Sequence, residues 1–98
     1  MKEIKTNELQ DAFEQGEQLS IIDVRRDDEV AEGKIPGAKH IILDELPERF
    51  EEIDKNKTQY LVCRSGGRSS RAGEFLESKG YDVVNVDGGM LNWTGETE

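Results

Sequence analysis

Residues 59–69 read QYLVCRSGGRS and form the most informative stretch of the chain. The run from Gln59 to Val62 predicts a buried β-strand, and the glycine-rich, doubly basic turn after it predicts the start of a helix. This order places the only cysteine, Cys63, at the carboxyl end of the strand. Backbone N–H groups, a helix N-terminus and nearby guanidinium groups all favour the anionic form of a thiol. The stretch therefore predicts a reactive thiolate.

Short strands and helices alternate along the rest of the chain. We expect strands at residues 3–5, 19–24, 40–42, 59–62 and 81–86. We expect helices that begin at the capping residues Thr6, Asp44 and Ser69, a helical turn within residues 25–32, and a short last helix at residues 90–93. Residues 19–24 are apolar on both faces, which is typical of a central parallel strand. The sequence thus predicts an α/β fold with three layers, a mainly parallel central sheet flanked by helices.

Length and composition limit the possible classes of protein. Ninety-eight residues with 34% hydrophobic content suit a single domain over residues 1–98, with a frayed tail at 94–98. One cysteine and one histidine cannot supply a structural zinc site, so we expect no metal and no cofactor. The net charge of −9 argues against nucleic acid and anionic membranes as partners. The chain shows no signal peptide and no membrane-spanning run, so we expect a cytoplasmic protein with a reduced thiol.

The loop after Cys63 has the composition of an anion site. Between Cys63 and Gly73 there are three arginines and no acidic residue, which predicts a positive island in an acidic chain. We expect the substrate to be bound by the loop residues, which are Arg64, Ser65, Gly66, Gly67, Arg68 and Ser69. In this interpretation the backbone N–H groups form a cradle, and the Arg68 side chain closes it. The alternative is a buried structural cysteine beside a chance cluster of arginines, but a structural strand end has no need of two adjacent glycines.

Three separated segments of the chain resemble the motifs of rhodanese-like domains, the sulfurtransferase family. The first segment is IDVR at residues 22–25, followed by Glu29 and then GKIPGA at 33–38, and the second is VCRSGGRS at 62–69. The third is GYDV at residues 80–83 with VDGGM at 86–90, followed by Trp93. The segments agree with the family in order and spacing, and they cover nearly the whole chain.

The resemblance implies a sulfur relay with Cys63 as the catalytic nucleophile. The thiolate would attack the outer sulfur of a small anionic donor such as thiosulfate, release sulfite and hold the sulfur as a persulfide. A ring of backbone N–H groups would stabilise the persulfide anion without a titrating base. Because the chain has no second cysteine, we expect an external thiol or a protein cysteine as acceptor.

Further residues near the first motif are expected to support the site. Asp23 and Arg25 follow the second strand, and we interpret them as a pair that pins neighbouring loops. Glu29 is expected to pair with Arg25 from one helical turn away. His40 is far in sequence from Cys63, so we assign it a structural or surface role. Where the family often has histidine before the Ile-Pro pair, this chain has Lys34, which we expect to affect the turn and not the sulfur chemistry.

Three alternative functions remain open. A phosphatase or an arsenate reductase of the same fold would also use a cysteine, but related phosphatases place five residues between cysteine and arginine. Here four residues separate Cys63 from Arg68, which favours the sulfurtransferase form. A module that only binds a partner usually lacks the cysteine. A carrier that receives persulfide sulfur from a partner protein would share Cys63 with the enzyme and differ in its turnover of free thiosulfate.

Overall fold

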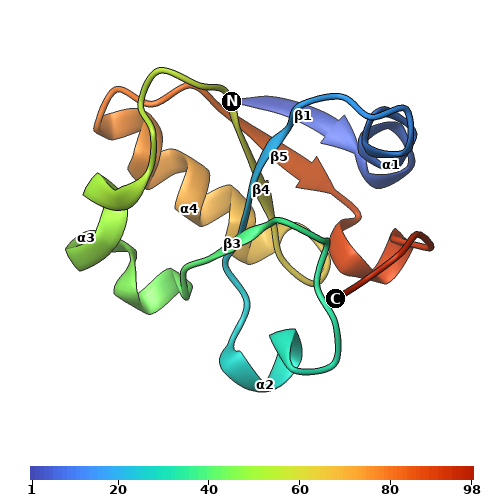
Figure 1. Cartoon of the computed structure of the whole chain (residues 1–98). Coiled ribbons are helices and arrows are strands. Elements are labelled where there is room, and N and C mark those ends of the chain that lie inside the picture. The colour runs from blue at the N-terminus through green and yellow to red at the C-terminus, as the bar shows by residue number, and fades with distance from the viewer.

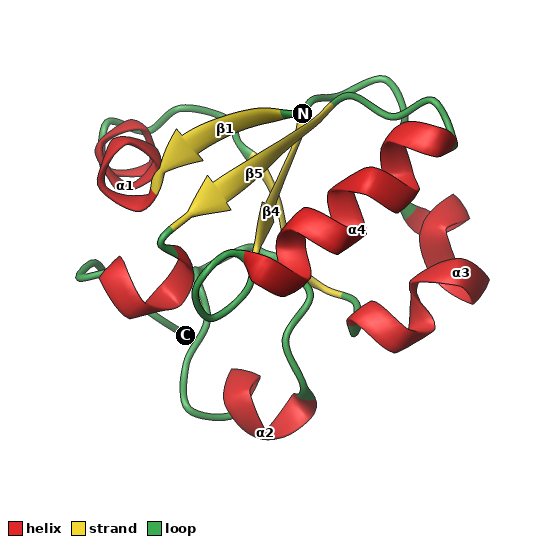
Figure 2. Cartoon of the chain, turned by 180° about the vertical axis from the view of Figure 1, so that it is seen from behind, coloured by secondary structure: helices red, strands yellow, loops and turns green.

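A computed structural model describes residues 1–98 and contains one five-stranded parallel sheet between two layers of helices (Figures 1 and 2). The strands are β1 Lys2–Lys5, β2 Ser20–Asp23, β3 Lys39–His40, β4 Gln59–Val62 and β5 Val83–Asp87. The α-helices are α1 Thr6–Glu14, α2 Asp27–Val30, α3 Leu46–Arg49 and α4 Gly67–Ser78. Short 3-10 helices span Leu43–Glu45, Phe50–Glu52 and Gly89–Asn92. No helix combines the length and the apolar character needed to cross a membrane.

The strand order β1-β5-β4-β2-β3 places β4 in the middle of the sheet. Tyr60 of β4 is in register with Ile21 of β2 on one side and with Val84 of β5 on the other. All pairings are parallel, so the carboxyl ends of β2, β4 and β5 lie at the same edge. The predicted three-layer α/β fold is confirmed, and Cys63 lies at the edge where such sheets bind ligands.

Alternate residues of the central strands face opposite layers. Ile22 and Leu61 belong to a buried cluster with residues of α4, whereas Ile21 and Val62 belong to a second cluster with Leu9 of α1. Figure 2 shows α3 and α4 on one side of the sheet and α1 on the other. Because side chains alternate along a strand, the residue after Val62 points toward α4. The strand period therefore directs the cysteine side chain to the helix that begins beside it.

The prediction that Thr6 caps the first helix is wrong. Lys5 is the N-cap of α1, and Thr6 is the first helical residue and is buried. Its hydroxyl donates to the carbonyl oxygen of Gly89 at 2.9 Å. The contact joins residues far apart in the sequence, so propensity at a helix start could not indicate it.

The expected helix over residues 44–53 is divided into three short pieces. A 3-10 turn ends at Glu45, α3 covers Leu46–Arg49, and a second 3-10 turn follows. Pro47 stands in the first turn of α3 and has no N–H to continue a hydrogen-bond ladder from the preceding turn. The apolar spacing was correctly interpreted as helical, but the proline limits the length of each piece.

The start of α4 also differs from the expectation. We predicted Ser69 as its N-cap, but Gly66 occupies that position with φ of 129°, a region that favours glycine. Ser69 instead lies buried in the first turn. The helix α4 stops at Ser78, and Gly80 follows with φ of 87°, as is common for glycine just after a helix end.

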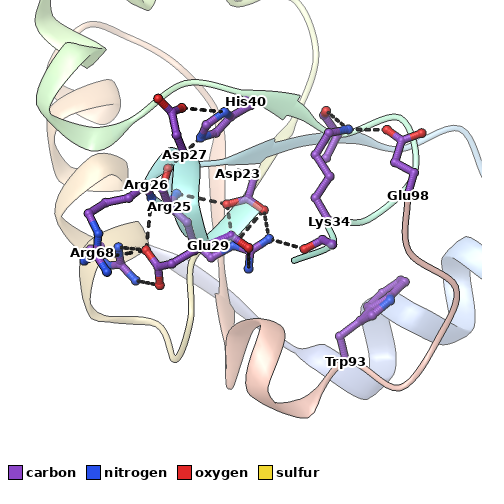
Figure 3. A network of polar contacts seen from close by, with 12 residues as sticks. Asp23, Arg25, Arg26, Asp27, Glu29, Lys34, His40, Arg68, Trp93 and Glu98 are labelled. Atoms are coloured by element: carbon purple, nitrogen blue, oxygen red, sulfur yellow. Dashed lines mark hydrogen bonds and ion pairs between the residues drawn. The ribbon is translucent and has the colours of Figure 1, made fainter. Parts of the chain in front are cut away.

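Residues 94–98 are held against the domain, contrary to the predicted frayed tail. Glu98 and Lys34 exchange two backbone hydrogen bonds of 2.9 and 3.2 Å, and their side chains form an ion pair (Figure 3). The indole N–H of Trp93 donates to the carbonyl oxygen of Glu96 at 2.9 Å. The departure from the family at Lys34 thus supplies the cation that binds the last residue.

We predict that Gly89→Ala destabilises the domain more than Gly37→Ala. Both glycines have positive φ, of 52° and 82°, and alanine there costs roughly 1 to 2 kcal/mol by backbone strain alone. A Cβ at Gly89 would lie 2.4 Å from the carbonyl oxygen of Cys63, whereas a Cβ at Gly37 would meet no heavy atom within 4 Å. Urea unfolding of the two variants measures the difference. Equal unfolding midpoints would contradict the predicted clash.

Candidate active site

Cys63 follows β4 directly, and its side chain is buried between the sheet and α4. The residue is 1% exposed. The loop of residues 64–66 links it to α4, and in Figure 2 this loop lies beside the last short helix. The sulfur is thus shielded from bulk solvent by the sheet, the loop and α4.

The segment 88–91 turns the carbonyl groups of the loop away from the sulfur. Its backbone N–H groups donate to three successive carbonyl oxygens, from Met90 to Cys63 at 2.9 Å, from Leu91 to Arg64 at 3.0 Å and from Gly88 to Ser65 at 3.1 Å. Because these carbonyl oxygens accept hydrogen bonds from segment 88–91, the N–H groups of the loop are free to face the sulfur. In this arrangement the N–H group of Gly66 reaches the sulfur at 3.1 Å.

Donors inside the cradle lower the pKa of the Cys63 thiol. Gly66 N–H donates to Cys63 Sγ at 3.1 Å, and Ser69 Oγ lies 3.4 Å from the same sulfur. Burial raises the pKa of the thiol, but hydrogen bonds from the Ser69 hydroxyl and from the N–H groups of Ser69, Gly66 and Ser65 outweigh that effect. The net shift is below the ordinary value, so the loop favours the nucleophilic thiolate.

Asn85 is a site residue that our sequence analysis missed. It lies in β5 on the face toward α4 and is 3% exposed. Its Oδ1 accepts a hydrogen bond from the Ser69 hydroxyl, and its Nδ2 donates to the Gly66 carbonyl at 3.4 Å. The available signal was a polar residue within the apolar stretch VVNV. Since the serine hydroxyl has one proton, donation to the sulfur requires that Ser69 releases Asn85.

Arg68 and Glu29 form a two-point ion pair across the mouth of the loop (Figure 3). The Nη1–Oε1 and Nη2–Oε2 distances are 2.6 and 2.8 Å. We predicted that Arg68 closes the cradle over an anion, but its guanidinium is bound by a carboxylate in this structure. The predicted pairing of Glu29 with Arg25 is wrong, because Arg25 contacts only the backbone carbonyl of Glu29, at 3.3 Å.

Asp23 and Arg25 form the buried pair that we expected. Arg25 Nη2 lies 2.7 Å from Asp23 Oδ2, and both side chains are at most 7% exposed. The same nitrogen donates to the carbonyl oxygen of Gly33 at 2.8 Å. Arg25 therefore ties the end of β2 to the segment that follows α2, and Asp23 supplies the charge that makes its burial tolerable.

One of the three arginines of the predicted positive island is neutralised in three dimensions. Arg68 is paired with Glu29, which comes from a distant part of the sequence. Arg64 and Arg71 are exposed and make no ion pair. Ser65 and Gly67, which we also expected to bind substrate, are exposed at the loop surface. Charge counted along the sequence thus overstates the positive field at the site.

A cleft of about 580 Å³ opens beside the loop. Arg64 lines it from the loop, Glu29 and Glu32 from the α2 region, and Leu91 and Trp93 from the C-terminal segment. The cleft is the space next to the loop in which a donor or an acceptor would fit.

His40 supports the backbone on the other side of Arg25. Its Nε2 lies 2.7 Å from the Arg25 carbonyl oxygen, which agrees with the structural role that we assigned to it. No set of three His, Cys, Asp or Glu side chains lies where it could hold a metal ion.

Comparisons with known proteins identify the family. The family model described as a rhodanese-like domain matches residues 5–96 of the chain. The protein named "Putative sulfurtransferase YtwF" of Bacillus subtilis is 48% identical over 98 residues, which cover 100% of this chain and 95% of that protein. The "Putative sulfur carrier protein YrkF" of the same organism is 38% identical over 98% of this chain and 52% of its own length. The crystal structure of a rhodanese-like domain protein from Staphylococcus aureus has a TM-score of 0.93 and 43% identity, with 100% of this chain and 97% of that chain covered.

The fold and the cysteine loop define a rhodanese-type domain. With a family match over residues 5–96 and a relative of 48% identity that is covered over 95% of its length, the chain belongs to the rhodanese-like domain family.

We predict that Ser69→Ala raises the pKa of the Cys63 thiol. The substitution removes the hydroxyl that can donate to the thiolate once it releases Asn85, and it leaves the backbone donors in place. Thiolate formation, followed by ultraviolet absorbance against pH, then occurs at higher pH than in the wild type. Ser70→Ala is the matched control, because no hydrogen bond joins Ser70 to the sulfur. An unchanged pKa in Ser69→Ala would show that the hydroxyl does not act on the thiolate.

We predict that Asp23→Asn lowers the free energy of unfolding by about 3 to 5 kcal/mol, because it leaves the Arg25 charge buried without a counter-charge. The control is Asp28→Asn, since Asp28 pairs with Arg26 at 3.2 Å on the exposed surface and such pairs contribute little. Urea unfolding measures both variants. An equal decrease in the free energy of unfolding for Asp23→Asn and Asp28→Asn would contradict the structural role of the buried pair.

Proposed function

We propose that this domain transfers sulfane sulfur through a persulfide on Cys63. The observation that carries the proposal is the sulfur of a buried cysteine that faces Gly66 N–H at 3.1 Å and the Ser69 hydroxyl at 3.4 Å. Donors in this position stabilise negative charge on the sulfur. They act on the thiolate that attacks and on the persulfide anion that results.

In the first half-reaction the Cys63 thiolate attacks the outer sulfur of a small anionic donor, for which thiosulfate is the simplest example. The thiolate electron pair forms a new S–S bond, and the S–S bond of thiosulfate breaks with its electron pair on sulfite. The products are the Cys63 persulfide anion and sulfite, so charge and atoms balance. The loop N–H groups then hold a larger anion at the same place.

In the second half-reaction an external thiolate attacks the outer persulfide sulfur and regenerates the Cys63 thiolate. The acceptor is a small thiol or a cysteine of another protein, because the chain has no second cysteine. We place the cycle in the cytoplasm, where a free thiol stays reduced.

A sulfur carrier is the second candidate function. A relative of 38% identity bears the name of a sulfur carrier protein, and this chain spans about half of its length. In that case Cys63 would receive sulfur from a protein donor, with the same cradle around it. Slow turnover of thiosulfate together with stable loading of Cys63 would favour the carrier.

Phosphoryl transfer is less well supported by the geometry. Four residues lie between Cys63 and Arg68, and Glu29 holds the arginine that a phosphate would need. His40 is bonded to a backbone carbonyl oxygen and is not directed at the loop as a general acid.

We predict that treatment with thiosulfate adds one sulfur atom to the wild-type chain and none to Cys63→Ser. Intact-mass measurement under non-reducing conditions detects the gain, and subsequent incubation with a small thiol removes it. The proposal fails if no sulfur is added by any sulfane sulfur donor while a phosphate ester is hydrolysed in a Cys63-dependent way.

A further inference from the structure

The basic side chains around the cleft are paired with acids almost throughout. Besides the Arg68–Glu29 and Arg25–Asp23 pairs, Arg26 Nε lies 3.2 Å from Asp28. Arg64 is the one arginine lining the cleft that has no ion pair. A doubly charged anion in the cleft therefore meets one unpaired guanidinium, that of Arg64, while Arg25, Arg26 and Arg68 are held by acids.

Glu29 is held firmly where it can keep Arg68 occupied. Its side chain is 16% exposed, and it makes two contacts of 2.6 and 2.8 Å to the guanidinium. It also accepts a hydrogen bond from Arg26 N–H at 3.1 Å at the start of α2. The Arg68 guanidinium lowers the pKa of Glu29 to about 2. Glu29 is thus ionised at neutral pH, and protonation does not release Arg68 there.

The charge of the whole chain acts in the same direction. The net charge of −9 repels anions at long range, more strongly for a dianion than for a neutral or singly charged donor. The cradle itself offers backbone N–H groups, which suit one sulfur atom and do not require a charged ligand.

We propose that Glu29 is a specificity-determining residue: by holding Arg68 it disfavours dianionic sulfur donors and favours organic persulfides of low charge. The inference rests on the sulfur transfer proposed above and names the donor class. With a persulfide R–S–SH, the Cys63 thiolate attacks the outer sulfur, and the S–S bond of the persulfide breaks with its electron pair on the leaving thiolate R–S⁻. The proton of the transferred sulfur then moves to that thiolate. The products are the Cys63 persulfide anion and R–SH.

The test compares two donors in Glu29→Gln and Glu32→Gln. Both variants lose one carboxylate from the same cleft, but Glu32 does not hold Arg68. We expect Glu29→Gln to raise kcat/KM for thiosulfate about tenfold. The reason is that the released Arg68 guanidinium can then donate one charge-assisted hydrogen bond to the dianion. For the persulfide of 2-mercaptoethanol, kcat/KM changes by less than about twofold, because a released Arg68 adds little attraction for a donor of low charge. In Glu32→Gln both donors change by less than about twofold, as for an exposed charge.

Equal changes for the two donors in Glu29→Gln, or a lower kcat/KM for thiosulfate, would overturn the inference. If Glu29→Gln unfolds at a lower urea concentration than the wild type, the inference is tested on the wild-type protein instead. There, kcat/KM for thiosulfate should rise with ionic strength while that for the persulfide stays constant, and a fall for thiosulfate overturns the inference. If neither donor loads sulfur onto wild-type Cys63, the proposed function itself has failed, which is a separate result.

Discussion

The site depends on three hydrogen bonds between segment 88–91 and the carbonyl groups of Cys63, Arg64 and Ser65. A loop of this composition has N–H and carbonyl groups in equal number, and a cradle for an anion requires that the carbonyls be engaged elsewhere. The last turn of the chain engages them. The Thr6 hydroxyl in turn holds the Gly89 carbonyl oxygen, so α1 supports the same turn. The cysteine environment is thus assembled from the beginning, middle and end of the sequence.

The arginines Arg25 and Arg68 near this loop hold segments of the protein together through ion pairs, which leaves them less able to attract anions. Arg25 and Arg68 each bind an acid of the first motif, and each connects segments that border the cleft. A buried or half-buried guanidinium needs such a partner, because an unpaired one would be costly away from water. What remains to stabilise negative charge on the sulfur is mainly the backbone and one hydroxyl. This explains how a chain with a net charge of −9 can still favour a thiolate.

Local patterns predicted the elements of the fold well where burial and local preference agree. The two-sided apolar pattern of residues 19–24 indicated a central parallel strand, and glycine at position 80 indicated the end of α4. Predictions failed where a side chain serves a distant partner. Ser69 looks like a helix cap but binds Asn85, and the last five residues look frayed but are held through Glu98, which pairs with Lys34. In both cases the deciding contact joins segments that lie far apart in sequence.

The sequence by itself determined the position of the single cysteine, at the carboxyl end of a central strand and before a helix. One cysteine between an apolar strand and a glycine-rich helix start has few other structural interpretations, since strand period and backbone freedom are local properties. Only the tertiary structure decided which groups surround the sulfur and which charges remain free. Asn85 of β5 binds Ser69 of the helix α4 that packs on it, and Glu29 neutralises Arg68 from a separate helix. Hydrogen bonds and ion pairs act through space over a few ångströms, so their partners emerge only when the parallel strands bring distant segments to one edge.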